Sequence, residues 1–460
     1  MLTTSIFKSY DIRGRAPEEI DVAGARRIAK TIAYLEHPAR VVIGRDMRAT
    51  SSDLEEALID GFLSAGVSVA RIGLCTTPMF NFAIGEAEGA YDLGVMVTAS
   101  HNPGAYNGFK ITRKDNLPIG QGSGMEELRD FACSEQALLD APERGSVAQD
   151  DLLMERYVER VLRNTALPDE LPLMSIAVDA GNGMEGIVLP RIRSRLRGIS
   201  LLELFWDPDG SFPNHEANPL KTETLDELKK TVLRDGCAFG VAFDGDADRV
   251  GFVDEKGDVI PGDILTALFA KEVLQERGAG TVLYDLRSSW SVQEVIRELG
   301  GVPVMSRVGH AHIKRQMRDA GALFAGELSM HFYFQDFWNC ESSDFAMLCL
   351  LKILLREQKP LSEIWRPLQR YVHSGEINFS VHDQRRVMAD IEERYGEAAV
   401  DVSHLDGLRM EFRPFGQPEE DWWFNIRASN TEPLLRLNLE ARTVKAMERH
   451  KEELSLLIQS

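Results

Sequence analysis

The feature of this chain that most constrains its fold is a recurring order of apolar strand, polar loop, helix and second apolar strand. The order is read at residues 41–72 and 281–305, and a third copy opens at residue 175. Strands that alternate with helices indicate parallel sheets with right-handed crossovers. In such sheets ligands bind beyond the carboxyl ends of the strands, so the loops there are where chemistry is expected.

The C-terminal part of the chain has a different order of elements. It reads as strand, helix, three strands and helix, at residues 376–381, 387–395, 408–412, 423–426, 434–439 and 444–458. This order is typical of an antiparallel α+β module. We therefore expect an α/β protein of three related mixed domains with mainly parallel sheets, followed by an α+β domain, with boundaries at 1–148, 149–256, 257–370 and 371–460.

Composition excludes several classes of protein. The chain has 460 residues, of which 44% are hydrophobic and 27% charged, as in ordinary globular proteins with several cores. The formal charge is 52 − 72 = −20, which argues against nucleic acid as a partner. An anionic substrate therefore needs a local cluster of basic side chains.

Cysteine usage and hydropathy favour a cytoplasmic location. The five cysteines are odd in number and none has C-x-x-C spacing, which argues against a disulfide framework and a zinc ribbon. The first residues show no secretory pattern. The strongest apolar stretch, 345–355, is interrupted by Lys352 and is too short to span a bilayer, so it reads as a core helix.

A serine stands directly after a predicted buried strand. Residues 93–97 are apolar and lead into Thr98-Ala99-Ser100-His101-Asn102-Pro103. A strand end is where a nucleophile would meet its substrate. Serine and asparagine are also common in turns, so these residues alone leave a turn or a helix cap equally open.

Three aspartates alternate in the loop that follows the apolar run 238–242. Asp244, Asp246 and Asp248 supply carboxylates that can converge on one hard cation. An EF-hand loop is one alternative, but Arg249 stands where that loop needs glycine, and strands flank it. A solvated acidic turn fits poorly between two apolar runs. The spacing therefore favours a metal site with oxygen ligands.

Two further loops are weaker signals. Glu327 and Ser329 follow the run 322–325 and could bond sugar hydroxyls, although a strand ending in a turn explains them equally. The segment 427–433 combines the bidentate guanidinium group of Arg427 with small side chains that donate hydrogen bonds. Such a segment could bind a phosphate, or it could be an ordinary polar hairpin loop. Together the four loops offer a nucleophile, a metal site, hydroxyl contacts and a phosphate grip, one from each predicted domain.

With these loops and Tyr10-Asp11-Ile12-Arg13-Gly14 in the same order, the whole chain resembles the α-D-phosphohexomutase superfamily, in its phosphomannomutase/phosphoglucomutase branch. The resemblance implies a heart-shaped, four-domain architecture and a phosphorylated Ser100. It implies one Mg²⁺ per chain, held by that phosphate with Asp244, Asp246 and Asp248. It also implies that mannose or glucose 6-phosphate and 1-phosphate are interconverted through a hexose 1,6-bisphosphate. Hexose phosphates are then the partners of a monomer or weak dimer that binds neither nucleic acid nor membrane.

The roles of single residues also follow from the resemblance. Tyr10, Arg13 and Lys110 match positions lining the reaction centre, Lys110 and His331 are the candidates for proton transfer, and Arg249 would neutralise charge beside the phosphoserine. Glu327 and Ser329 match contacts to O3 and O4 of the sugar. The other implied substrate contacts are Arg287, His310, Arg427, Ser429, Asn430 and Thr431.

Three departures from the branch pattern bear on the sugar more than on the chemistry. Met330 stands where glycine is usual, Arg287 where lysine is common, and Glu341-Ser342-Ser343-Asp344 replaces a typical aspartate pair. Bulk from Met330 beside the sugar loop is expected to discriminate between the C2 epimers by roughly 10–200-fold at most.

Three other functions stay open at this point. A phosphoglucosamine mutase usually carries glutamine in its sugar loop and glycine at the position of Asn430. A catalytically silent sugar-phosphate-binding protein has no need of both Ser100 and the three aspartates. A metal phosphatase would hydrolyse the bisphosphate without isomerising it.

Overall fold

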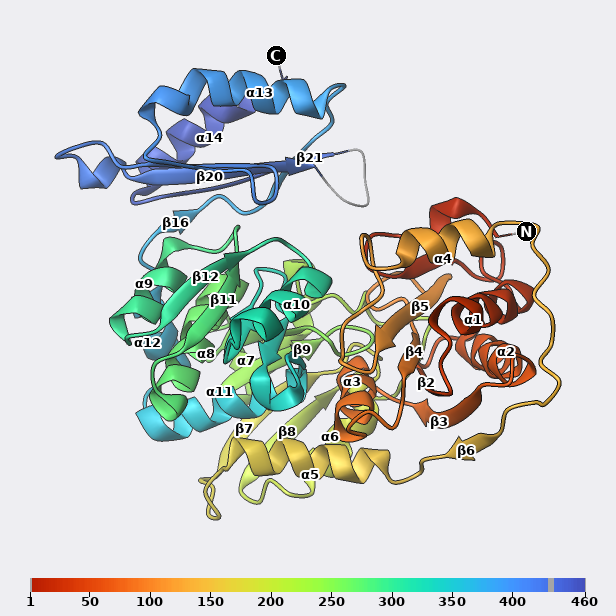
Figure 1. Cartoon of the computed structure of the whole chain (residues 1–460). Helices are drawn as coiled ribbons and strands as arrows, with labels where there is room; N and C mark the ends of the chain where they lie inside the picture. The colour runs from red at the N-terminus through yellow and green to blue at the C-terminus, as the bar shows by residue number, and fades with distance from the viewer. Residues whose placement is uncertain (1, 429–433, 460) are drawn as a thin grey trace. The chain divides into compact units, whose positions relative to one another are not determined.

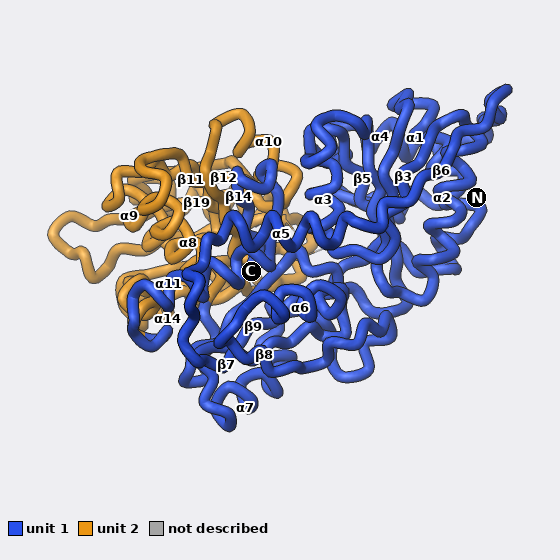
Figure 2. The backbone as a smooth tube through the Cα atoms, turned by 90° about the horizontal axis from the view of Figure 1, so that it is seen from below, with its two compact units in different colours: residues 1–260, 329–362 blue, residues 261–328, 363–460 orange. Residues whose placement is uncertain are grey.

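The computed structural model describes residues 2–428 and 434–459, so Ser429, Asn430 and Thr431 lie outside the described residues. The chain forms two compact units (Figures 1 and 2). The first unit comprises residues 1–260 and 329–362, and the second comprises residues 261–328 and 363–460.

The first unit contains a six-stranded sheet in the order β1-β5-β4-β2-β3-β6. In that order the strands span Ile12–Arg15, Tyr106–Arg113, Leu93–Val97, Arg40–Arg45, Ser68–Leu74 and Val147–Gln149. Four helices accompany them: α1 (Val22–Glu36), α2 (Ser51–Ser64), α3 (Thr77–Glu86) and α4 (Met125–Ala132). Figure 1 shows α1 and α2 on one side of the sheet and α3 on the other. Covered on both faces, β4 consists of five buried residues, which explains its unbroken apolar sequence.

A second sheet of the first unit has the order β10-β9-β7-β8. Its strands span Val250–Asp254, Phe239–Phe243, Met174–Asp179 and Ile199–Leu204, and its helices are α5 (Leu153–Thr165), α6 (Glu185–Arg193) and α7 (Asp226–Asp235). The antiparallel pair β14 (Phe332–Phe334) and β15 (Cys340–Glu341) leads into α11 (Ser343–Glu357), which packs on α5. The predicted core helix at 345–355 is confirmed, since most of α11 is buried.

The second unit begins with three parallel strands. β11 (Thr281–Asp285) lies between β12 (Val302–Ser306) and β13 (Phe324–Gly326), with helices α8 (Gly262–Arg277), α9 (Trp290–Glu298) and α10 (His310–Ala320). The short helix α12 spans Leu361–Trp365.

The C-terminal part of the second unit is an antiparallel sheet in the order β16-β21-β20-β19-β18, with β17 also paired to β21. Its strands span Val372–His373, Leu435–Ala441, Trp422–Ala428, Leu408–Phe412, Asp401–Ser403 and, for β17, Ile377–Phe379. Helices α13 (Gln384–Tyr395) and α14 (Val444–Gln459) cover one face of this sheet, and an apolar core lies between them and the strands (Figure 1).

The predicted class is confirmed: mixed α/β sheets with mainly parallel strands, then an α+β module. The four domain boundaries remain predictions. Two strands, β5 and β10, return antiparallel to β4 and β9, so the serine loop and the aspartate loop each join a strand to its antiparallel neighbour. Within the described residues, no helix has the length and apolar character needed to cross a bilayer.

Candidate active site

The serine loop and the aspartate loop meet although they extend from different sheets. Ser100 follows β4, Asp244 follows β9, and Ser100 Oγ donates a hydrogen bond of 2.7 Å to Asp244 Oδ2. The approach needs a glycine, because a Cβ on Gly245 would lie 2.4 Å from the carbonyl oxygen of Ser100. The two strand ends are thereby combined into one site.

Ser100 has an unusual backbone conformation. Its φ is 51°, in the left-handed region that non-glycine residues seldom adopt, and its side chain is buried. The N–H of Ser100 donates to Thr98 Oγ1 at 2.9 Å. Strained backbone is often found at active sites, where the surrounding structure holds it in place.

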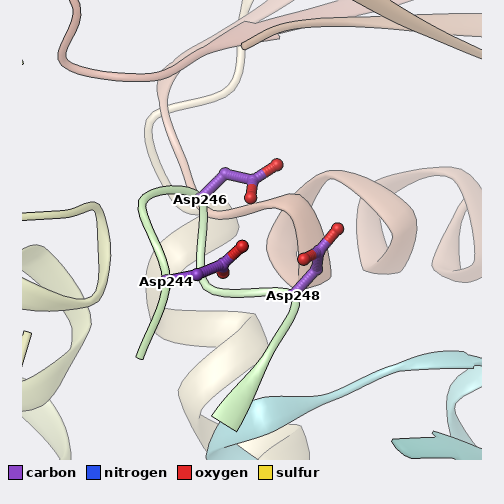
Figure 3. Close-up of side chains that lie close together, drawn as sticks. All are labelled: Asp244, Asp246 and Asp248. Atoms are coloured by element: carbon purple, nitrogen blue, oxygen red, sulfur yellow. The ribbon is translucent and has the colours of Figure 1, made fainter. Parts of the chain in front are cut away.

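The three aspartates form a buried carboxylate cluster. Figure 3 shows their side chains projecting from one short loop, and one carboxyl oxygen from each lies within 4.8 Å of the others. Burial, followed by the charges of Asp248 and Asp246, raises the pKa of Asp244 well above its usual range. Asp246 Oδ1 is buried and has no hydrogen-bond partner in the described part of the chain. A buried set of oxygen donors with surplus negative charge fits a hard divalent cation such as Mg²⁺.

Lys110 is the first cation beside this cluster. It lies on β5, and its Nζ is 2.6 Å from Asp246 Oδ2 and 2.6 Å from Asp248 Oδ2. Burial alone would lower the pKa of Lys110, but the two carboxylates outweigh it and the pKa is raised. In this arrangement the Lys110 ammonium group offsets part of the negative charge of the aspartates.

Arg249 and His331 form a second group beside the aspartates. Arg249 Nε lies 3.2 Å from His331 Nε2 and 3.9 Å from Asp244 Oδ2. His331 Nε2 is 3.4 Å from Asp248 Oδ1, and its Nδ1 is 2.9 Å from Ser329 Oγ. Burial opposes ionisation of Asp248, but Lys110 and then His331 hold its pKa well below its usual range. His331 is thus oriented by a hydroxyl on one ring nitrogen and faces a carboxylate with the other.

The N-terminal motif contributes Arg13 to the same region. Arg13 Nη1 donates to Asn102 Oδ1, two residues after the serine, at 2.6 Å. Burial opposes its charge, but Asp11 outweighs burial and raises the pKa of Arg13. Tyr10 lies half-buried in the bend before β1.

Arg48 is a supporting residue that sequence reasoning missed. Its buried guanidinium donates to four backbone carbonyls of the serine loop at 2.5–2.9 Å, those of Ser100, Asn102, Pro103 and Tyr106. Asp46 pairs with its Nε at 3.1 Å. The signal was available, because Asp46 and Arg48 follow β2, a parallel strand whose end the same rule marks.

Thr77 and His101 were also missed. Thr77 opens α3, and its Oγ1 donates to Asp246 Oδ2 at 2.6 Å while its N–H donates to the carbonyl of Asp246 at 2.9 Å. His101 Nδ1 lies 3.2 Å from Ser100 Oγ. Burial, then Arg249 and Arg13, keep the pKa of His101 well below its usual range, so a neutral imidazole adjoins the serine.

Three of the predicted substrate residues lie after strands of the parallel sheet in the second unit. Arg287 follows β11, and Asp285 holds its guanidinium through contacts of 3.3 Å and 2.7 Å. Glu327 follows β13, and its Oε1 accepts the N–H of Gly309 at 3.0 Å. His310, which follows Gly309 in the sequence, is the first residue of α10.

Arg427 lies within β20 in the C-terminal module and is buried. Of the predicted phosphate contacts in residues 427–433, Arg427 is the only one that lies among the described residues.

The structure gives Met330 a packing role. Its φ is 65°, which explains why glycine suits this position. The side chain is buried, and its sulfur is placed so that a Cβ on Gly251 would approach it to 3.0 Å. The thioether therefore packs on β10.

The segment 341–344 is also occupied by internal contacts. Tyr157 OH donates to Asp344 Oδ2 at 2.5 Å, and Asn81 Nδ2 donates to Glu341 Oε2 at 3.2 Å. Glu185 faces Asp344 as a second buried carboxyl group. These contacts with α3, α5 and α6 favour a structural role for this segment, where a role in sugar choice was expected.

Comparison with known families matches nearly the whole chain. Four models of the phosphoglucomutase/phosphomannomutase family match in order: alpha/beta/alpha domain I at residues 4–135, domain II at 155–257, domain III at 261–371 and the C-terminal domain at 376–457.

Relatives and solved structures agree with these matches. A phosphomannomutase of Methanocaldococcus jannaschii is 40% identical over 98% of this chain and 97% of its own length. A protein of Xanthomonas campestris named as phosphohexose mutases is 37% identical over 99% of this chain and 100% of its own length. The crystal structure of a phosphoglucomutase/phosphomannomutase family protein from Burkholderia thailandensis has a TM-score of 0.89 at 32% identity, covering 100% of this chain and 98% of that one.

Proposed function

Because the chain belongs to the phosphoglucomutase/phosphomannomutase family of phosphohexose-mutating isomerases, we propose that it interconverts the 6-phosphate and the 1-phosphate of mannose, glucose or both through a phosphoserine at Ser100. The observation that carries the proposal is the contact of Ser100 Oγ with the buried aspartate cluster. A nucleophile, a metal-binding donor set and two cations lie together there, which is what phosphoryl transfer needs.

The proposed reaction consists of two transfers that balance. Phospho-Ser100 gives its phosphoryl group to the free hydroxyl of a hexose monophosphate. The Oγ–P bond breaks, and the proton of the sugar hydroxyl passes to Ser100 Oγ. The resulting hexose 1,6-bisphosphate reorients in the site. Ser100 Oγ then attacks the other phosphate, the bond between that phosphorus and the sugar oxygen breaks, and the serine proton passes to that oxygen. His331 is proposed as the proton carrier, since its ring is oriented by Ser329, and Arg249 and Lys110 neutralise the developing charge.

A magnesium ion would be held by Asp244, Asp246 and Asp248 together with the phosphate on Ser100. When bound, the ion supplies positive charge that offsets the phosphoryl oxygens. Three aspartates and one Mg²⁺ sum to −1, and a phosphoserine adds about −1.5 to −2. The neighbouring cations are therefore needed as well as the metal.

The second unit supplies the proposed substrate contacts. Glu327 would bond a sugar hydroxyl, and Arg287 and His310 would lie beside the substrate. Ser329 is also proposed to bond a sugar hydroxyl. Arg427 would hold the non-reacting phosphate, together with Ser429, Asn430 and Thr431. Because mannose and glucose share their C3 and C4 configuration, contacts at those hydroxyls accept both sugars. A cytoplasmic monomer or weak dimer remains our expectation for the assembly.

A coupled assay tests this function. Purified protein with Mg²⁺ and a trace of hexose 1,6-bisphosphate is offered mannose, glucose and glucosamine 1-phosphates separately. Formation of 6-phosphate from mannose or glucose is expected to exceed that from glucosamine. Preference for glucosamine phosphate would indicate a phosphoglucosamine mutase. Release of inorganic phosphate without isomerisation would indicate a phosphatase, and binding without turnover a silent sugar-phosphate-binding protein.

A further inference from the structure

Within the second unit, one carboxylate is surrounded by three guanidinium groups. Glu376 immediately precedes β17, and its Oε1 lies 3.2 Å from Arg436 Nη1. Its Oε2 lies 3.6 Å from Arg427 Nη2 and 3.6 Å from Arg287 Nη1. Arg287, Arg427 and Arg436 come from three separate segments of the chain, so Glu376 is the anion on which they converge.

The contacts to Arg427 and Arg287 are ion pairs at a distance too long for hydrogen bonds. Arg287 has a second anchor in Asp285. Arg427 is 3% exposed, and its buried Nε has no hydrogen-bond partner among the described residues. Burial and then Arg287 lower the pKa of Arg427, while Glu376 acts against both. An arginine with an unused buried donor and only a loose counter-ion is suited to receive a stronger anion.

The two carboxylate oxygens of Glu376 are held unequally. Its side chain is 25% exposed, and Arg436 holds its other oxygen more closely than Arg427 or Arg287 holds Oε2. A phosphate with about −1.5 to −2 charge competes well with a single carboxylate for the same guanidinium forks.

We propose that Glu376 is an internal counter-anion that occupies Arg427 and Arg287 when no phosphate is bound, and returns to them when the phosphate leaves. The inference rests on the proposed function, in which these arginines hold the non-reacting phosphate. A mutase must release that phosphate and then accept the other end of the same bisphosphate. Binding that is equally tight before and during reaction gives no gain in rate, so a counter-anion that weakens the grip favours turnover. Glu376 is thus a positioning residue that acts through the two arginines.

The test is a calorimetric titration of inorganic phosphate into the full-length chain in magnesium-free buffer. It compares the phosphate affinity of wild type with that of Glu376→Gln. Glutamine keeps the shape and removes the charge, so phosphate affinity is expected to rise about fivefold, the effect of one unit charge at about 4 Å in a water-like dielectric. In the coupled assay, KM and kcat for the hexose phosphate should then fall together. Glu298→Gln, which removes another arginine partner in the same unit, is the matched control and should leave phosphate affinity unchanged.

Equal or weaker phosphate binding by Glu376→Gln would overturn the proposal and leave Glu376 a structural ion-pair partner only. An equal gain in Glu298→Gln would overturn it too, because the effect would then come from net charge. If Glu376→Gln does not fold, Glu376→Asp is tested instead. Aspartate is shorter by one methylene, so its carboxylate is withdrawn from the arginines, and its phosphate affinity must exceed that of wild type by less than the gain expected for Glu376→Gln. Phosphate titration does not depend on turnover. A wild-type protein without mutase activity would therefore contradict the proposed function, while the comparison of phosphate affinities would still test the role of Glu376.

Discussion

Ser100 Oγ donates to Asp244 Oδ2 across 2.7 Å, although 144 residues separate them in the sequence. The bond joins the carboxyl end of β4 to that of β9. Its consequence is that a phosphate on Ser100 would lie against three buried carboxylates. Such a phosphate is tolerable only with compensating positive charge, which a divalent cation, Lys110 and Arg249 would supply together.

Removing one aspartate should abolish metal binding. In wild-type protein Mg²⁺ is expected to raise the melting temperature, since binding to the native state at 100 times Kd stabilises it by about 2.7 kcal/mol. Asp246→Asn should lose this shift, because Asp246 Oδ1 is a buried oxygen that has no other partner among the residues described. The control Asp151→Asn, at an exposed position, should keep it. A magnesium shift that persists in Asp246→Asn would show that the ion binds elsewhere.

Replacing Arg48 should slow the reaction without preventing substrate binding. Arg48→Lys keeps the charge but cannot reach four carbonyls of the serine loop at once. Misplacement of the nucleophile by about 1 Å can cost about 10²-fold, so kcat should fall by that order with KM little changed. Arg26→Lys, at a surface ion pair, is the control. A kcat close to that of wild type would show that the loop keeps its position without Arg48.

The strand-end rule and side-chain type were enough to place Ser100 after a strand and to favour a metal site at the three aspartates, because the motifs are contiguous. The role of Ser100 as the nucleophile came from the family resemblance, since a turn or a helix cap explained the serine equally well. Arg48 and Thr77 were not predicted, since their roles depend on which loops the fold brings next to the serine and to Asp246. The antiparallel course of β5 and β10 was also missed, because each follows a polar loop of the kind that precedes a helix elsewhere in the chain. The left-handed φ of Met330 could not be read from an apolar side chain.

The buried pair of Glu185 and Asp344 should make stability depend on pH. Burial, then the neighbouring Asp344, raises the pKa of Glu185 well above 4.5, while Tyr157 bonds the other carboxyl group. The folded protein thus holds a proton that the unfolded chain releases above about pH 4.5. This contribution to stability is fully present below that pH and is lost as pH rises toward the folded pKa, at up to about 1.4 kcal/mol per pH unit.

Glu185→Gln removes this linkage. The melting temperature of the variant relative to that of wild type should therefore increase as the pH rises from 5 to 8. Melting curves at matched ionic strength measure the difference. Parallel profiles for the two proteins would show that Glu185 is ionised in the folded state.

Met330→Gly should change stability rather than sugar preference. The buried thioether packs on β10, and its loss is expected to cost about 2–4 kcal/mol, offset in part by the ease with which glycine adopts a φ of 65°. The ratio of kcat/KM for mannose and glucose 1-phosphates should stay within about twofold of wild type, since the side chain contacts protein. A larger change in that ratio would show that the thioether reaches the sugar.

The central claim is transfer through Ser100, and mass spectrometry of the purified protein tests it most directly. After incubation with hexose 1,6-bisphosphate, the account predicts one added phosphoryl group, located on Ser100 by peptide analysis, and its loss when excess hexose monophosphate is added. Ser100→Ala should show no added phosphate and a fall in kcat of at least about 10⁴-fold. Full turnover in Ser100→Ala, or a transferable phosphate on another residue, would contradict the account.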